Sequence, residues 1–219
     1  MSPSLLVGVC GGSGSGKSTL AARVADQWEA AQPGARAVVL SFDAYYHDQS
    51  HLPMAERALV NYDHPDSLDV GLMAAHLRAL RAGNGVGVPG YDFATYRRTG
   101  DVALVGPAEL VLVEGILLFA FADLWELLDY RVFRNCPEPV RFERRLVRDT
   151  TERGRTVASV KAQLAASVKP MHDRYVQPHA EAADFVTEHG DDLDDVTARL
   201  LAELTVRAAA AAAAAPARP

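Results

Sequence analysis

The sequence predicts an α/β fold in which helices cover both faces of a parallel sheet of about five strands. Short apolar runs, each long enough for one buried strand, alternate along the chain with segments whose apolar residues recur at helical spacing. Strands and helices that alternate in this way form parallel sheets covered on both faces. The 219 residues, 49% of them hydrophobic, are enough for one domain with a full core.

The expected strands are five apolar runs separated by polar or helical segments. They are SLLVGVC at 4–10, ARAVVLSFD at 35–43, AELVLVEGILLF at 108–119, YRVFRNC at 130–136 and ADFVTEHG at 183–190. Continuous apolar runs of this length are typical of strands that are buried in a parallel sheet.

Helical patterns lie between these runs. The first, at 18–31, places Leu20, Val24 and Trp28 four residues apart and therefore on one face. Further helices are expected at about 69–82, 137–153, 156–175 and 192–208.

Two segments do not fit the alternation. Residues 84–104 are rich in Gly, Tyr and Thr and carry turn signals, so they predict a small β-hairpin excursion from the sheet. Residues 209–219 form an alanine- and proline-rich tail whose alanines favour extension of the last helix until Pro216. We therefore expect a single domain over 1–208.

Charge and composition exclude several classes of protein. A formal net charge of -6 argues against binding to a nucleic-acid polymer, which needs a basic field. No apolar stretch approaches the roughly 18 residues of a membrane span, and the N-terminus lacks the pattern of a secretory signal. Cys10 and Cys136 are far apart and form no disulfide framework, which indicates a reducing compartment and predicts a cytoplasmic protein.

The stretch GGSGSGKST lies between the first expected strand and the first expected helix. It satisfies G-x-x-x-x-G-K-[ST], in which glycines let backbone N–H groups turn toward phosphate oxygens at a helix N-terminus. Lys17 would reach the β- and γ-phosphates of ATP, and the Ser18 hydroxyl would bind Mg²⁺. The predicted nucleotide-binding residues of this loop are Gly11, Gly12, Ser13, Gly14, Ser15, Gly16, Lys17, Ser18 and Thr19. The motif predicts a P-loop NTPase-type three-layer fold.

A phosphate loop serves switch GTPases, motor ATPases and kinases alike. The N-K-x-D element of guanine switches is missing from the sequence, and Glu114, in LVLVEG, could organise a metal in all three classes. A kinase differs because it needs an acceptor site and a lid that protects the γ-phosphate from water.

The sequence offers candidates for both. Asp43 ends the second expected strand, where it would face the phosphate loop as a general base or as a ligand of the metal's water shell; helix capping is the alternative role. The lid, expected at about 141–170, begins with a run of arginines. They are Arg141, Arg144, Arg145, Arg148, Arg153 and Arg155. Arg141, Arg145 and Arg148 share one helix face, where guanidiniums suit phosphate; a solvated face is the alternative.

The chain resembles the uridine kinases, also called uridine-cytidine kinases, over about residues 5–190. The resemblance is carried by GGSGSGKST, FDAYYHD, NYDHPDSLD, PGYDFATYRRT, LVLVEGILLF, RRLVRDTTERGRT and VKPMHDRYVQP. It implies ATP- and Mg²⁺-dependent phosphorylation of the 5′-hydroxyl of uridine, cytidine or both, and a homo-oligomer, often a homotetramer. The residues alone leave open a related kinase for another small alcohol, such as a sugar phosphate or pantothenate, and a non-catalytic ATP-binding module.

The resemblance also implies roles for the matching residues. Asp43 matches the catalytic base, and Asp63, with Arg145, matches the contact to the ribose 2′- and 3′-hydroxyls. Tyr46, Tyr91, Phe93 and Gln163 match residues of the nucleoside site. Arg148 and Arg153 match basic residues at the phosphate end, with Arg148 predicted to be catalytic, and Arg155 matches a lid residue that binds ATP. Glu114 and Ser18 match the metal site.

Tyr96 departs from the family pattern. It stands where many family members have a histidine that faces the polar edge of the pyrimidine. A tyrosine hydroxyl both donates and accepts hydrogen bonds, so chemistry alone leaves the base preference open. Our hypothesis is that cytidine is phosphorylated at least as well as uridine.

Overall fold

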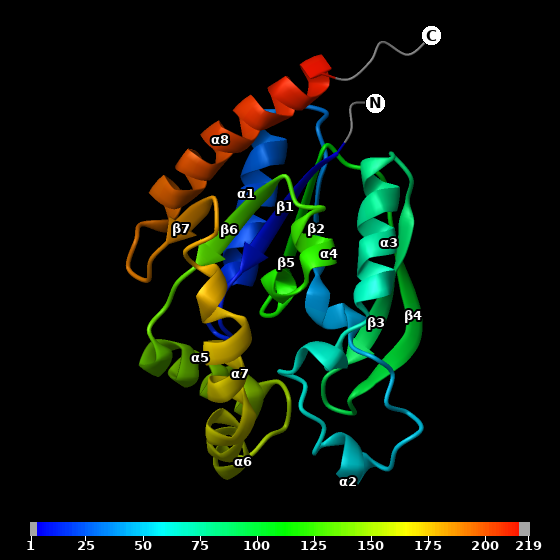
Figure 1. Ribbon diagram of the computed structural model, residues 1–219, viewed down its shortest axis with the longest axis vertical. Coiled ribbons are helices and arrows are strands. Elements are labelled where there is room, and N and C mark those ends of the chain that lie inside the picture. The colour runs from blue at the N-terminus through cyan, green and yellow to red at the C-terminus, as the bar shows by residue number, and fades with distance from the viewer. Residues whose placement is uncertain (1–3, 215–219) are drawn as a thin grey trace.

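The computed structural model describes residues 4–214 and confirms the predicted parallel sheet (Figure 1). Its strands are β1 (Leu5–Cys10), β2 (Ala37–Ser41), β5 (Leu110–Gly115), β6 (Tyr130–Arg134) and β7 (Phe185–Thr187). They pair in the order β2-β5-β1-β6-β7, and every pairing is parallel. All five predicted apolar runs therefore supply one strand each.

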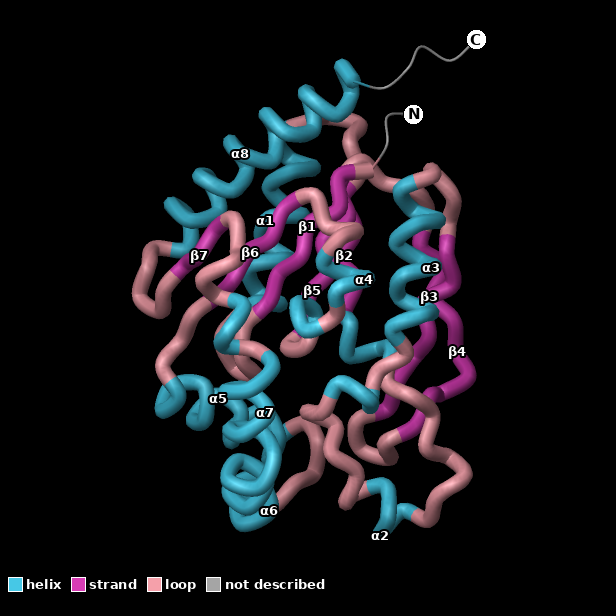
Figure 2. Tube along the Cα trace, viewed as in Figure 1, coloured by secondary structure: helices cyan, strands magenta, loops and turns pink. Residues whose placement is uncertain are grey.

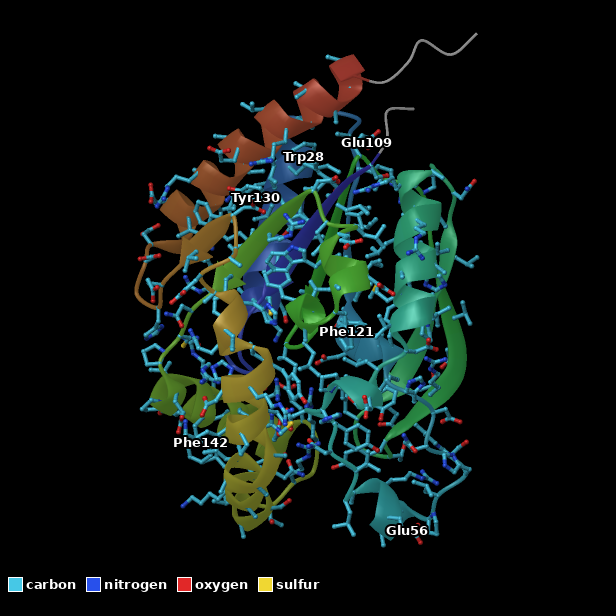
Figure 3. The ribbon with its side chains drawn as sticks, in the orientation of Figure 1. Trp28, Glu56, Glu109, Phe121, Tyr130 and Phe142 are labelled. Carbon is cyan, nitrogen blue, oxygen red and sulfur yellow. The ribbon has the colours of Figure 1, made fainter. Side chains whose placement is uncertain are left out.

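Helices cover both faces of this sheet, as predicted. The helices α1 (Lys17–Ala31) and α8 (Leu193–Ala214) pack on one face, and α3 (Val70–Arg81) and α4 (Ala122–Trp125) on the other (Figures 1 and 2). Side chains alternate along β1 because successive residues of a strand point to opposite faces. Leu5, Val7 and Val9 pack with α1 and α8, together with Trp28 and Tyr130, which Figure 3 shows beneath α8.

The strands end earlier than predicted. Phe42–Tyr45 continues β2 as a 3-10 turn, so Asp43 is not at the end of a strand but just beyond it. Likewise β5 ends at Gly115, and the apolar residues that follow form a 3-10 turn at Leu118–Ala120. These residues are apolar because they are buried against the sheet, and an apolar run by itself does not distinguish a buried turn from a strand.

The predicted excursion is an antiparallel hairpin of β3 (Val86–Asp92) and β4 (Arg97–Val105). The register shifts between Pro89 and Tyr91, so the hairpin carries an irregularity close to the turn. At that turn Tyr96 has a φ of +55°, in the left-handed region that non-glycine residues seldom adopt.

The segment predicted to form the lid is a run of helices that follows β6. It consists of α5 (Glu138–Thr151), α6 (Val157–Gln163), a π-helical turn at Leu164–Val168 and α7 (Lys169–Tyr175). A single helix was predicted over 156–175, and the π-helical turn interrupts it. Short turns of helix also form at α2 (Met54–Arg57), Pro65–Ser67 and Gln177–His179.

The C-terminal helix α8 continues through the alanines to Ala214, beyond the predicted 208. The rest of the predicted tail, 215–219, lies outside the described residues. None of the helices within 4–214 combines the length and the apolar character that a membrane crossing requires.

Candidate functional site

The phosphate loop connects the end of β1 to the start of α1. Gly14 and Gly16 have φ values of +81° and +93°, a conformation that favours glycine, and the N–H of Ser15 donates to the carbonyl of Gly12 at 3.0 Å. A Cβ at Gly14 would collide with the backbone carbonyl oxygen of Arg141. Both the conformation and the packing therefore require glycine at this position.

A cavity of about 370 Å³ lies against this loop. Its lining residues are Gly14, Ser15, Gly16, Lys17, Ser18, Thr19, Arg134, Arg144, Arg148 and Leu193. Ser18 and Thr19 are exposed to it, whereas Gly11 and Gly12 are buried beneath the loop. The structure thus brings most of the predicted nucleotide-binding residues to one cavity whose charged side chains are all cationic.

Lys17 faces Glu114 from the neighbouring strand. Its Nζ lies 3.8 Å from Oε2 of Glu114, and both side chains are only 8% exposed. Among residues 4–214, Oε2 of Glu114 has no hydrogen-bond donor. A buried carboxylate oxygen in this state suits a hydrated cation, and the Ser18 hydroxyl, which lines the loop cavity, is also an oxygen donor of the kind that Mg²⁺ prefers. The residues predicted to bind the metal therefore fit it.

A second pocket adjoins the first and contains the predicted acceptor residues. Its lining residues are Ser13, Lys17, Asp43, Tyr46, Tyr62, Asp63, Tyr91, Phe93, Tyr96, Ile116, Arg145, Arg148, Arg153 and Arg155. The free volume is about 50 Å³, because aromatic and arginine side chains fill much of the space. Gln163 lines a neighbouring cavity of about 360 Å³ that shares Asp63 and Arg145 with this pocket.

The turn after β2 places Asp43 in this pocket. Ser41 occupies the N-cap position of the turn, and no side chain donates or accepts a capping hydrogen bond there. The alternative role of Asp43 as a helix cap therefore has no support in the structure.

One wall of the pocket, called here the aromatic wall, is built from aromatic rings. The ring of Tyr96 stacks on Tyr62, with centroids 5.0 Å apart and planes 17° apart, and Tyr46 meets the edge of Tyr62 at 5.5 Å. The guanidiniums of Arg153 and Arg155 lie over the rings of Phe93 and Tyr96, at 4.3 and 5.5 Å. Sequence reasoning missed Tyr62, although it immediately precedes Asp63 in NYDHPDSLD.

The side chain of Asp63 is 13% exposed and contacts α5 and the π-helical turn that follows α6. Its Oδ1 lies 3.8 Å from Nη1 of Arg145, and its Oδ2 accepts a hydrogen bond from the Ser167 hydroxyl at 3.2 Å. Burial raises the pKa of Asp63, although Arg145 and Ser167 oppose the effect. Ser167 was not predicted, because its approach to Asp63 depends on how the helices after α5 fold back.

The predicted arginine face is divided in the structure. Arg141 is buried, donates from Nε to the carbonyl of Cys136 at 2.9 Å, and packs against Gly12 beneath the phosphate loop. Arg144 is exposed and reaches the Gly14 carbonyl at 3.3 Å. Of the predicted face, Arg145 and Arg148 converge on one carboxylate, whereas Arg141, one turn earlier on α5, contacts the Cys136 carbonyl instead.

The residue on which the arginines converge is Asp149, which sequence reasoning missed. Asp149 is fully buried and forms ion pairs with four guanidiniums, those of Arg145, Arg148, Arg153 and Arg155. Burial by itself would raise the pKa of Asp149, but the arginines hold it below the ordinary value. A signal was present in the sequence, since Asp149 lies four residues from both Arg145 and Arg153 on a basic helix.

Comparisons with known proteins agree with this geometry. A sequence model of the phosphoribulokinase / uridine kinase family matches residues 6–195. The chain is 40% identical over 188 residues to a uridine kinase of Leuconostoc citreum (86% of this chain, 89% of that protein), and 41% identical over 187 residues to one of Clostridium perfringens (85% and 88%). A solved structure described as a possible uridine kinase from Bacillus stearothermophilus superposes with a TM-score of 0.58 at 19% identity, covering 85% of this chain and 89% of that one. This last likeness concerns the fold alone.

Proposed function

Because the chain belongs to the phosphoribulokinase and uridine kinase family, we propose that it transfers the γ-phosphoryl group of ATP to the 5′-hydroxyl of uridine and cytidine. The products are UMP and CMP. The observation that carries this proposal is that Lys17 and Arg148 line both the loop cavity and the acceptor pocket. A phosphoryl group bound in the first is therefore next to a hydroxyl bound in the second.

On the donor side, the loop N–H groups and the Lys17 ammonium hold the β- and γ-phosphates of ATP. The loop suits this role because its glycines fix the backbone and α1 begins directly behind it. Ser18 and Glu114 would hold Mg²⁺, which would supply positive charge to the transferring group. Arg153 and Arg155 were also predicted to bind ATP, but both line the acceptor pocket, over Phe93 and Tyr96, and neither lines the loop cavity.

On the acceptor side, Asp43 takes the proton of the attacking 5′-hydroxyl. Asp63 accepts hydrogen bonds from the ribose 2′- and 3′-hydroxyls, with Arg145 as the paired donor, because a vicinal diol is well held by a carboxylate and a guanidinium. The aromatic wall, which includes Tyr46, Tyr91, Phe93 and Tyr96, offers faces on which a pyrimidine stacks. Gln163, beside Asp63, is a further contact for the nucleoside.

The lid arginines stabilise the transferring group and limit the access of water. Arg148 reaches the phosphate loop, with Nη2 at 3.4 Å from the Ser13 hydroxyl, and therefore lies where charge develops during transfer. The small free volume of the acceptor pocket supports a site that opens for the nucleoside and closes around it.

The proposed setting is the cytoplasm, with small molecules as the only substrates. Both cysteines are free and buried, which supports a reducing compartment. The net charge of -6 argues against a nucleic-acid polymer as a partner. Self-association, as a homotetramer, follows from the resemblance and is measurable by light scattering coupled to size-exclusion chromatography.

An acceptor screen tests the proposed activity. ADP release is measured with ATP and Mg²⁺ in the presence of each ribonucleoside, a sugar phosphate and pantothenate. Uridine and cytidine should give the highest kcat/KM. Turnover restricted to a sugar phosphate or pantothenate would move the protein to another kinase activity. The absence of any acceptor-dependent ADP release would support a non-catalytic ATP-binding module.

A further inference from the structure

We infer that Asp149 is a positioning residue that holds four lid arginines in the arrangement needed for phosphoryl transfer. The inference rests on the proposed function, since it assigns these arginines to the transferring group. Asp149 itself lines neither the loop cavity nor the acceptor pocket. It therefore acts through the arginines rather than on a substrate.

The two oxygens of Asp149 pair with different arginines. Oδ1 accepts from Nε of Arg148 at 2.9 Å, lies 2.8 Å from Nη2 of the same residue, and is 3.6 Å from Nη1 of Arg153. Oδ2 accepts from Nη1 of Arg155 at 2.9 Å and is 3.4 Å from Nε of Arg145. One carboxylate thus fixes the relative positions of four guanidiniums.

Each of these arginines has a second contact within the site. Arg148 reaches the Ser13 hydroxyl of the phosphate loop, and Arg145 reaches Asp63 in the acceptor pocket. Arg153 and Arg155 lie over the aromatic wall. A change at Asp149 therefore affects the donor side and the acceptor side together.

The charge of the cluster supports a catalytic purpose. Four guanidiniums share one buried carboxylate, so the cluster keeps positive charge after Asp149 is counted. Within residues 4–214, Nε of Arg145 and Nε of Arg155 are buried without a hydrogen-bond acceptor. Buried donors are normally satisfied, so these two suit oxygens of a bound phosphate or ribose.

Asp149 also fixes the backbone of the connection between α5 and α6. The N–H of Arg155 donates to the Asp149 carbonyl at 3.0 Å, which folds the connection back on α5. Gly154 makes this reversal with a φ of +63°. The side-chain pairs to Arg153 and Arg155 hold the same connection in place, so Asp149 contacts it through both its backbone and its side chain.

The first test compares Asp149→Asn with Asp149→Glu. Asparagine keeps the shape of the side chain but removes its charge, so the arginines lose their common partner. We expect kcat to fall by about 100-fold or more, because removing a group that stabilises charge in the transition state has an effect of this size. The KM for ATP should change less than about 3-fold, because the loop and Lys17 bind the ground state. Glutamate restores the charge at a slightly shifted position. The kcat of Asp149→Glu should therefore be about 10-fold higher than that of Asp149→Asn.

The matched control is Asp195→Asn on α8, where the carboxylate is also paired with an arginine four residues away, Arg199. This variant should keep the wild-type kcat. Wild-type kcat in Asp149→Asn would overturn the inference. Equal losses in the Asn and Glu variants, with rates that follow the folded fraction measured by circular dichroism, would also overturn it. If Asp149→Asn does not fold, Asp149→Glu decides by the same criterion: a lower kcat at unchanged KM for ATP supports the inference, and wild-type kcat overturns it.

The second test does not depend on turnover. Trypsin cleaves after arginine, and Arg153 and Arg155 are held by Asp149 with side chains 18% and 12% exposed. Cleavage at these two sites should be at least about 5-fold faster in folded Asp149→Asn than in the wild type or Asp195→Asn, because the connection opens more often. Equal rates would overturn the inference. Failure of the proposed function would instead appear as a wild-type protein that phosphorylates no nucleoside.

Discussion

Lys17 Nζ and Glu114 Oε2 lie 3.8 Å apart and join the phosphate loop to the strand beside it. In the register of the sheet, Glu114 on β5 is opposite Val9 on β1, so its carboxylate is level with the start of the loop. The strand pairing therefore fixes Glu114 beside Lys17, which is where the proposed metal site requires a carboxylate. Because both side chains are buried, water has little access to them and cannot take over the interactions of the carboxylate if its charge is removed.

The first prediction concerns this carboxylate. In Glu114→Gln, about 10-fold more Mg²⁺ should be needed for half-maximal activity, because the amide is a weaker ligand for the metal and its bound water. The control is Glu109→Gln, at the amino end of β5 and far from the loop (Figure 3), where Oε2 accepts from the Arg36 N–H at 2.7 Å. The measurement is kinase activity as a function of Mg²⁺ concentration, made on the wild type and on both variants. Superimposable curves for Glu114→Gln and the wild type would remove Glu114 from the metal site.

The second prediction concerns the proposed base. In Asp43→Asn, kcat should fall by about 10²- to 10⁴-fold, because an amide does not accept the hydroxyl proton. The dissociation constant for an ATP analogue, measured by calorimetry, should stay within about 3-fold, because Asp43 lines the acceptor pocket and not the loop cavity. Asp123→Asn, an exposed carboxylate on α4, serves as the control and should leave both values unchanged. Near-normal turnover of Asp43→Asn would reject Asp43 as the base.

The sheet was predictable because it depends on local patterns, whereas element boundaries depend on burial. Apolar runs and helical spacing identify all five strands, yet the residues that follow β5 are apolar because they pack as a buried turn. The break at Leu164–Val168 likewise has no local signal, since the segment LAASV is compatible with a regular helix.

The site was predictable where residues adjacent in sequence act together. The phosphate loop is such a unit, and its nine residues were identified from the sequence. Asp149, Tyr62 and Ser167 act through neighbours that the lid and the acceptor loop bring to them, and this depends on tertiary folding. Arg141 is a residue whose sequence spacing was misleading. It has the same helical spacing as Arg145 and Arg148, but its side chain contacts Cys136 and Gly12 rather than Asp149.

The third prediction separates backbone conformation from packing in the loop. Gly14 and Gly34 both have positive φ, +81° and +90°, but only Gly14 faces a backbone carbonyl, that of Arg141, while nothing lies within 4 Å of a Cβ at Gly34. Gly34→Ala should cost about 1–2 kcal/mol of stability and leave ATP affinity unchanged. Gly14→Ala should in addition weaken ATP binding by at least about 10-fold, because the loop must shift. Equal ATP dissociation constants in the two variants, measured by calorimetry, would contradict the close packing at Gly14.

The fourth prediction concerns stability against pH. His172 is buried, its Nδ1 has no partner within residues 4–214, and burial together with nearby Arg141 lowers its pKa from 6.5 to about 4. Its neutral form contributes stability that is fully present above pH 6.5 and is lost as the pH falls toward 4, because the unfolded chain takes up a proton that the folded chain resists.

Urea denaturation at several pH values tests this effect. Between pH 6.5 and 4, the free energy of unfolding should fall roughly 1–3 kcal/mol further in the wild type than in His172→Gln. His189→Gln, which alters an exposed histidine, should give a curve parallel to that of the wild type. Parallel curves for His172→Gln and the wild type would show that His172 titrates normally in the folded protein.

The fifth prediction concerns the base preference and Tyr96. Its ring lies between Tyr62, at 5.0 Å, and the Arg155 guanidinium, at 5.5 Å, so the phenol is held in the pocket rather than free to turn away. The hydroxyl accepts from the amino group of cytosine or donates to the carbonyl of uracil, so neither base is penalised. We expect kcat/KM for cytidine to equal or exceed that for uridine.

Two substitutions at Tyr96 test the contribution of the hydroxyl. Tyr96→Phe keeps the stack on Tyr62 and loses one hydrogen bond, so kcat/KM should fall about 2- to 10-fold for both nucleosides. Tyr96→His tolerates the φ of +55°, since histidine is enriched in the left-handed region, but its shorter ring shifts the polar atom, so the ratio of cytidine to uridine kcat/KM should change by about 3-fold or more. A strong wild-type preference for uridine, or a ratio that stays constant in both variants, would show that Tyr96 does not set the choice of base. The aromatic wall would then hold the pyrimidine by stacking alone, which does not distinguish the two bases.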